Sequence, residues 1–273
     1  MNKYISSIYL MFLPILIYSQ QNCELLKDDE KCYKACLTMN QESFHHQGSY
    51  QSQKHLSDAI DLCPTLSNAY FEKSVAFLKR GLFVEWKQLM DIAVELNPEQ
   101  HLMYRGWCQF FFLRNYDKAK EDLSQLANIK GEKFIGVGQN GEYDLRVVIA
   151  LCHRYTGNKK KAIKILEETL SKEDYYEGIY DNLHLGVLYM ESEVYDKAKE
   201  YFIRQLKLNE FAEAYYYLAK TEYLEGNIQK AKENIGKADE LYLKNRKMSS
   251  YYYEYPDQIY KIDIVNLGKL INS

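Results

Sequence analysis

The chain has 273 residues, of which 47% are hydrophobic and 27% are charged, and this balance excludes an intrinsically disordered protein. The formal net charge of −3 provides no excess of basic residues of the kind that nucleic-acid binding requires. Tyrosine is frequent, at 26 residues against 4 prolines, which favours stacked helices with aromatic side chains between them over a β-rich domain.

Residues 1–20 differ in kind from the rest of the chain. A single lysine precedes an apolar run from Ile8 to Ile17, and a short polar stretch follows, which is typical of an export signal cut near Ser19 or Gln20. The run is shorter than the roughly 20 apolar residues that span a bilayer, and it contains Pro14, although a retained anchor stays the alternative. We therefore expect a protein of the periplasm, the cell envelope or the exterior, without a membrane span after cleavage.

A lead-in over 21–31 precedes a series of helical hairpins, and the most regular of them is Phe211–Leu241. Its first helix is expected to bury Tyr215, Leu218, Ala219 and Tyr223, which fall at helical spacing. Gly226-Asn227 then ends that helix, because glycine adopts the left-handed conformation of a helix C-terminus. The second helix places these apolar residues inward: Ile228, Ala231, Ile235, Ala238 and Leu241. Less regular copies are predicted over 32–64, 67–98, 101–127, 143–171 and 179–210.

The spacing of Leu218-Ala219, Tyr223, Gly226, Ala231, Ile235 and Ala238 resembles that of the tetratricopeptide repeat, a helix-turn-helix unit of 34 residues. The resemblance implies an all-α, right-handed solenoid of about six repeats over 32–241. The last repeat of a solenoid exposes an apolar face, so the segment 242–273 is predicted to cover it, extended around Pro256 and helical at its end. Tyr251-Tyr252-Tyr253 could instead form a ligand platform.

One segment, 128–142, interrupts the period. It contains the spacing G-x-G-x-x-G from Gly136 to Gly141, which in a dinucleotide site brings backbone amides to a pyrophosphate. The context of such a site is missing, because no βαβ unit surrounds it and three lysines, 159–161, stand where a ribose-binding acid is expected. We interpret the segment as a flexible loop between repeats.

Six cysteines follow the predicted cleavage point, so disulfides are possible in an oxidising compartment. Cys36 lies near the start of the first repeat, and Cys63 lies at its end, so the two should be neighbours in an antiparallel hairpin. A Cys36–Cys63 or a Cys32–Cys63 bridge is therefore expected. Cys108 and Cys152 fall on the inner sides of repeat helices and are predicted to be buried free thiols.

In proteins of this family, partners bind to the face that the first helix of each repeat lines. Transferred position by position, the resemblance predicts partner contacts at Phe71, Lys79, Arg105, Gln109, Phe112, Arg154, Tyr155, Tyr216, Lys220 and Tyr223. The mixture of apolar and cationic side chains would suit a protein or peptide segment that carries apolar anchors and an acidic group.

The sequence contains no G-x-S-x-G, H-E-x-x-H or G-K-[ST] pattern, and its histidines have no ligand-spaced partners. We therefore predict a non-catalytic binding scaffold of the cell envelope, with no cofactor and no metal. Two alternatives stay open: a component of envelope or outer-membrane assembly, and a small-ligand binder or enzyme that uses the loop Gly131–Gly141.

Overall fold

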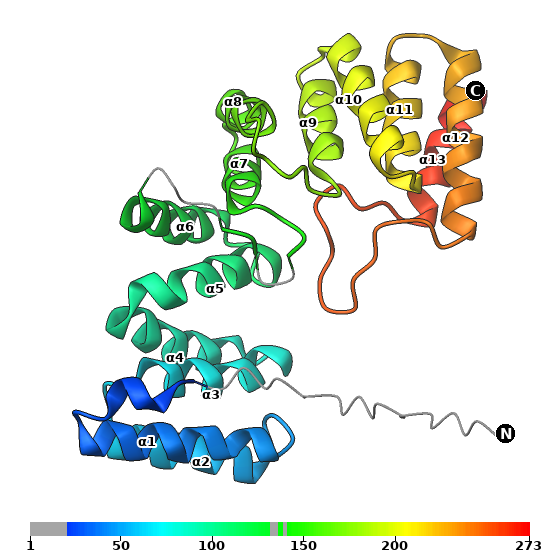
Figure 1. Ribbon diagram of the computed structural model, residues 1–273. Coiled ribbons are helices and arrows are strands. Elements are labelled where there is room, and N and C mark those ends of the chain that lie inside the picture. The colour runs from blue at the N-terminus through cyan, green and yellow to red at the C-terminus, as the bar shows by residue number, and fades with distance from the viewer. Residues whose placement is uncertain (1–20, 132–135, 139–140) are drawn as a thin grey trace, which may run out of the picture. The chain divides into compact units, whose positions relative to one another are not determined.

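The computed structural model describes residues 21–131, 136–138 and 141–273, and every regular element among them is a helix. The predicted export signal lies outside the described residues, as does part of the predicted insertion. The all-α fold that the repeats predict is confirmed. The chain divides into two compact units, one ending at Asn97 and the other running from Pro98 to Ser273 (Figure 1). No helix in the described part of the chain is both long enough and apolar enough to cross a membrane.

Unit 1 consists of two helical hairpins, α1 with α2 and α3 with α4, preceded by a short 3-10 turn. Its elements are η1 (Cys23–Leu26), α1 (Glu30–Asn40), η2 (Gln41–Phe44), α2 (Tyr50–Leu62), α3 (Ser67–Lys79) and α4 (Phe83–Leu96). Asp29 caps α1 and Ser49 caps α2, each by accepting hydrogen bonds from backbone amides of the first turn. Trp86, which stands where the repeat pattern has alanine, is completely buried in α4.

Two disulfides fasten the first hairpin. Cys23 is bonded to Cys36, and Cys32 is bonded to Cys63. The predicted Cys36–Cys63 bridge is therefore wrong, and the structure contains its alternative, Cys32–Cys63. Antiparallel packing places the first turn of α1, where Cys32 lies, beside the end of α2, whereas Cys36 lies one turn further on and meets the lead-in. Cys108 and Cys152 are free and buried, as predicted.

Unit 2 contains four further hairpins and a final helix. Its helices are α5 (Pro98–Phe111), α6 (Tyr116–Lys130), α7 (Leu145–Tyr155), α8 (Lys159–Leu170), α9 (Asp181–Glu191), α10 (Tyr195–Leu208), α11 (Ala212–Leu224), α12 (Ile228–Leu243) and α13 (Lys261–Asn272). Between α11 and α12, Gly226 has a φ of 81°, in the left-handed region that its missing Cβ permits. Ala219 and Ala231 are fully buried where these two helices pack together.

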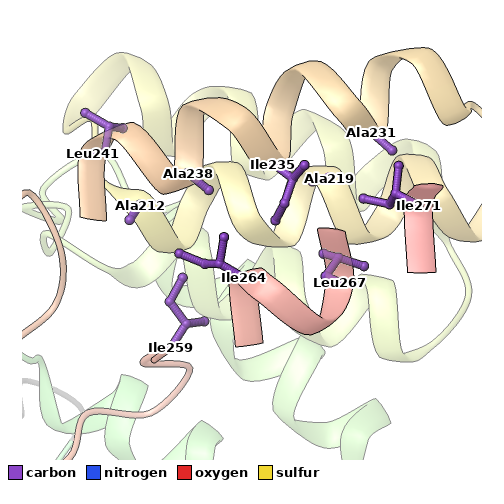
Figure 2. Close-up of a cluster of buried hydrophobic side chains, with 10 residues drawn as sticks. All are labelled: Ala212, Ala219, Ala231, Ile235, Ala238, Leu241, Ile259, Ile264, Leu267 and Ile271. Carbon is purple, nitrogen blue, oxygen red and sulfur yellow. The ribbon is translucent and has the colours of Figure 1, made fainter. Parts of the chain in front are cut away.

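The last helix, α13, packs against α12 and α11. Its apolar residues Ile264, Leu267 and Ile271 join Ile235 of α12 in one buried cluster (Figure 2). The opposite side of α13 carries Ile262 and other exposed residues, so the helix is amphipathic. By covering the side of α12 that has no following repeat, α13 keeps that apolar surface out of water.

An irregular segment connects α12 to α13, and it runs back along unit 2 as far as α5 (Figure 1). We call residues 249–258 of this connection the tail loop. Tyr251 and Tyr252 are exposed on it, whereas Tyr255, Pro256 and Asp257 are buried. Asp257 has a φ of 60°, an uncommon conformation for a residue with a side chain. The loop is thus an ordered part of the core of unit 2.

The predicted insertion is folded where the structure describes it. The amide of Gly138 donates to the carbonyl of Tyr143, and the amide of Leu145 donates to the carbonyl of Gly136. Gly138 lies against Trp107, and a Cβ placed there would come within 2.2 Å of the indole. Residues 136–138 and 141–145 are therefore folded next to α5, which corrects the prediction of a flexible loop for these residues.

Candidate functional site

The first helices of three hairpins in unit 2, α5, α7 and α9, contact the tail loop, and α11 contacts the residues on either side of it. We call this side of α5, α7, α9 and α11 the inner face. At its α5 end, the ring of Tyr253 lies 4.6 Å from that of Phe111 and 5.6 Å from that of Phe112, measured between ring centroids. Further along, the ring of Tyr255 lies 5.4 Å from that of Tyr180. Such aromatic contacts bury large areas with little loss of side-chain entropy, so they hold the loop firmly.

Both tyrosine hydroxyls of the loop meet a single carboxylate. Tyr255 donates to Glu142 at 2.9 Å, and Tyr253 donates to it at 3.3 Å. Glu142 belongs to the packed turn of the insertion, so the insertion supplies the acceptor that fixes the register of the loop. Glu254, which lies between these two tyrosines in the loop, forms an ion pair with Arg114, which follows α5.

The deepest contact of the loop is made by Asp257. Its carboxylate lies 2.8 Å from a guanidinium nitrogen of Arg154 on α7 and 2.7 Å from Nδ1 of His184 on α9. Burial opposes ionisation of Asp257, but the charge of Arg154 and the hydrogen bond from His184 outweigh it, so its pKa is lowered. An ionised carboxylate only accepts, so Nδ1 of His184 donates. In the neutral ring Nε2 then accepts from the Tyr143 hydroxyl, 3.0 Å away.

A buried glutamate holds the two ends of the loop. Both carboxylate oxygens of Glu213, in the first turn of α11, lie 3.1 Å from the amide of Met248, and the backbone of Ile259 also donates to this carboxylate. Burial raises the pKa of Glu213 to about 7, although the backbone hydrogen bonds counteract part of that effect. Because Met248 and Ile259 flank the tail loop, its two ends lie next to each other.

The structure changes the interpretation of four predicted contact residues. Arg105 is bound to Asp122 of its own hairpin through two hydrogen bonds of 2.9 and 2.7 Å. Gln109 is only 3% exposed, so it is wrongly assigned to a partner surface. Phe112 and Arg154 do lie on the inner face, but both already contact the tail loop.

The other predicted residues are spread over both units. Tyr155 stacks on Tyr116 at 4.4 Å and is partly exposed, while Tyr216 and Tyr223 pack against the cluster that α13 completes. Lys220 is partly exposed and has no ion-pair partner among the described residues. Phe71 and Lys79 belong to unit 1, where Lys79 donates to Gln47 at 2.6 Å.

The buried polar residues do not form a catalytic site that a substrate could reach. Tyr143, His184 and Asp257 are linked in the order of a proton relay, but Tyr143 and His184 are completely buried and Asp257 is nearly so. A general acid or base must come within hydrogen-bond reach of its substrate. Within the described residues no group of acidic, histidine and cysteine side chains is arranged to hold a metal ion. We therefore assign these residues to holding the loop.

A pocket of about 790 Å³ lies between the insertion and the connection from α8 to α9. Three of its charged groups are already engaged: Arg146 with Asp144 at 2.7 Å, and Glu142 with the tail loop. The amide of Gly141 donates to the carbonyl of Gly138, so neither glycine presents a free amide to a phosphate. These hydrogen bonds argue against a nucleotide site at Gly136–Gly141.

Sequence reasoning missed the residues that hold the loop. His184 and Asp257 are 73 residues apart, and no local pattern joins them. Glu213 and Glu142 carry no local signature, because a single glutamate in a sequence is ordinarily a surface residue. The only available signal was indirect: Pro256 interrupts the helical pattern of the tail and indicates an extended segment there.

Comparisons with known proteins agree with this architecture. A family model described as a tetratricopeptide repeat matches residues 182–211, which include α10 and most of α9. A comparison with curated proteins finds none of significant similarity.

Several solved structures have a similar fold. PilW, described as a widely conserved type IV pilus biogenesis factor, is 13% identical, with a TM-score of 0.58, over 77% of this chain and 94% of its own. PilF of Pseudomonas aeruginosa is 12% identical, with a TM-score of 0.55, over 82% and 95%. A tetratricopeptide repeat protein from Parabacteroides merdae is 17% identical, with a TM-score of 0.52, over 91% and 88%. Identities this low establish likeness of fold alone. By its helical hairpins the chain has the fold of tetratricopeptide-repeat proteins, and one of its repeats, residues 182–211, matches the model of that family.

Proposed function

We propose that this protein is a non-catalytic scaffold of the cell envelope that binds a protein or peptide segment through the first helices of its repeats. The observation that carries the proposal is the tail loop itself. An extended segment with aromatic anchors and carboxylates lies on the inner face, held by Arg114, Arg154 and Glu142. A surface that binds such a segment of its own chain has the chemistry to bind one from another protein.

The partner we propose carries apolar anchors and an acidic group. Arg114 and Arg154 bind the two carboxylates of the loop, and Lys220 offers a further cation that no described carboxylate neutralises. Charge-assisted contacts of this kind give direction and register, whereas the aromatic residues supply most of the buried area.

The proposed location in the cell envelope rests on the cysteines and on the first twenty residues. Two disulfides in the first hairpin are expected of a protein in an oxidising compartment, since cytosolic thiols are kept reduced. The apolar run Ile8–Ile17 provides the route to such a compartment. The disulfides and the apolar run each support a location outside the cytosol, independently of each other.

Affinity capture from the native envelope fraction tests the proposal. The wild-type protein should retain a protein partner, and Lys220→Glu should retain less of it because the charge reversal repels an acidic segment. Lys164→Glu, a reversal on the exposed face of α8, serves as the matched control and should retain the wild-type amount. Equal retention by both variants would exclude Lys220 from the binding surface.

A second candidate function is that of an envelope or outer-membrane assembly component. It is favoured by the fold likeness to PilW, whose title names it a pilus biogenesis factor, together with the expected export. Mild crosslinking followed by purification should then recover an outer-membrane protein, whereas a partner confined to the periplasm would argue for the scaffold without an assembly role.

A further inference from the structure

The tail loop leaves unit 2 and re-enters it at one place. Its flanking residues Met248 and Ile259 both donate to Glu213, so the loop leaves α11 and returns to it. The helix that follows, α13, is held separately by the cluster of Ile264, Leu267 and Ile271 with α12. The tail loop and α13 are thus attached to unit 2 by separate sets of contacts.

The contacts along the loop follow a short pattern. Tyr253 packs on α5, Tyr255 packs beside Tyr180 and bonds Glu142, and Asp257 enters the space between Arg154 and His184. The three contacting residues are spaced by two. Tyr253 and Tyr255 precede a turn at Pro256-Asp257, and that turn, in which Asp257 has a φ of 60°, brings its carboxylate to the same surface. Between them, Glu254 reaches Arg114.

We infer that the inner face of α5, α7 and α9 is a peptide-binding site that its own tail loop fills in cis. Its partner in trans is a segment with two tyrosines separated by one residue and an aspartate two residues later, placed by a turn like that of Pro256-Asp257. This inference rests on the proposed function and specifies its partner. The loop competes with such a partner because tethering gives it an effective concentration on the order of millimolar.

A loop-replaced variant separates the site from its cis occupant. Because the flanking residues share one carboxylate, a short Gly-Ser linker can replace residues 250–257 and leave α13 in place. The probe is a fluorescent synthetic peptide of residues 249–258, SSYYYEYPDQ. In fluorescence anisotropy it should bind the loop-replaced variant at least tenfold more tightly than the wild-type chain.

Two control peptides test the pattern. One carries Asp257→Asn, and the other carries Tyr253→Ala with Tyr255→Ala; each should bind the loop-replaced variant at least tenfold more weakly than the unmodified peptide. If the loop-replaced variant keeps the helical circular dichroism of the wild type but binds the peptide no better, or binds all three peptides equally, the inference is overturned.

A full-length variant covers the case in which the loop-replaced chain does not fold. Asp257→Asn in the complete chain weakens one anchor and keeps the loop, so peptide binding should rise above that of the wild type. No rise would contradict the inference. Either failure would leave the envelope partner of the proposed function untouched, since affinity capture tests that partner separately.

Discussion

Individual charged residues were the hardest to assign from the sequence. Arg105 and Arg154 were predicted to be available to a partner, yet Asp122 and Asp257 neutralise them. The position of an arginine within a repeat indicates the face on which it lies but not the carboxylate that it meets there. Cys108 and Cys152 were predicted correctly because burial of a small apolar side chain follows from helical periodicity alone.

Arg154→Ala should destabilise the protein strongly. Its side chain is 9% exposed and that of Asp257 is 3% exposed, so truncation leaves a buried carboxylate with no guanidinium beside it. The expected loss in the free energy of unfolding is about 3 kcal/mol, measured by denaturant titration. Lys220→Ala, which removes an unpaired cation, should change that free energy by less than about 0.5 kcal/mol. Equal losses in the two variants would contradict the buried pair.

The pKa of Glu213 predicts a pH dependence. Burial raises this pKa from 4.5 to about 7, so the folded state holds a proton that the unfolded state has lost. The contribution of Glu213 is therefore complete below pH 4.5 and is lost as the pH rises through 7, with a magnitude of about 3 kcal/mol. Glu213→Gln should flatten the dependence of the unfolding free energy on pH over this window, relative to the wild type. Parallel curves for the two proteins would contradict the raised pKa.

At the scale of elements, the hairpins of the repeat region were predictable and the connections were not. Period and turn glycines located α11 and α12 from the sequence. The same reasoning gave no sign that α9 would be buried on nearly every side. Neighbouring helices cover much of α9, and the tail loop adds a contact at His184 through Asp257, 73 residues further along the chain. The packed turn of the insertion was missed for a similar reason, because its contact is with Trp107 of another element.

The last helix offers a matched pair of leucines for testing its packing. Leu267 of α13 is 5% exposed within the cluster of Figure 2, whereas Leu270 on the same helix is 54% exposed. Leu267→Ala should cost about 2–5 kcal/mol of unfolding free energy by creating a cavity, and Leu270→Ala should cost under about 1 kcal/mol. Thermal or denaturant unfolding distinguishes the two. A similar cost for both would mean that α13 does not cover α12 as described.

Two glycines, one in the insertion and one in α12, form a matched pair for substitution. At Gly138 a Cβ would lie within 2.2 Å of Trp107, so Gly138→Ala must displace the packed turn or the indole and lower the melting temperature. At Gly236, inside α12, a Cβ would have no neighbour within 4 Å. Gly236→Ala should therefore stabilise the helix, by up to about 1 kcal/mol. A raised melting temperature for Gly138→Ala would refute the close contact with Trp107.

At the scale of the whole chain, the sequence predicted the class and the number of hairpins but not the two units. Continuity of the repeat pattern over 32–241 suggested a single solenoid, whereas the compact units meet at Asn97 and Pro98. A repeat pattern indicates how the two helices of each hairpin pack together. It says little about the strength of packing between successive hairpins. The same pattern assigned the first-helix face to binding but did not predict that part of the chain itself would occupy it.

The central claim is that a partner protein binds on the inner face of unit 2, and site-specific photo-crosslinking in the native envelope tests it most directly. A photoreactive residue is placed at Tyr155 or Lys220 on first helices, or at Lys164 or Ile203 on the exposed sides of α8 and α10. We expect a crosslinked protein adduct from the first two positions and none from the other two. Adducts that form only from α8 and α10, or from none of the four positions, would contradict it.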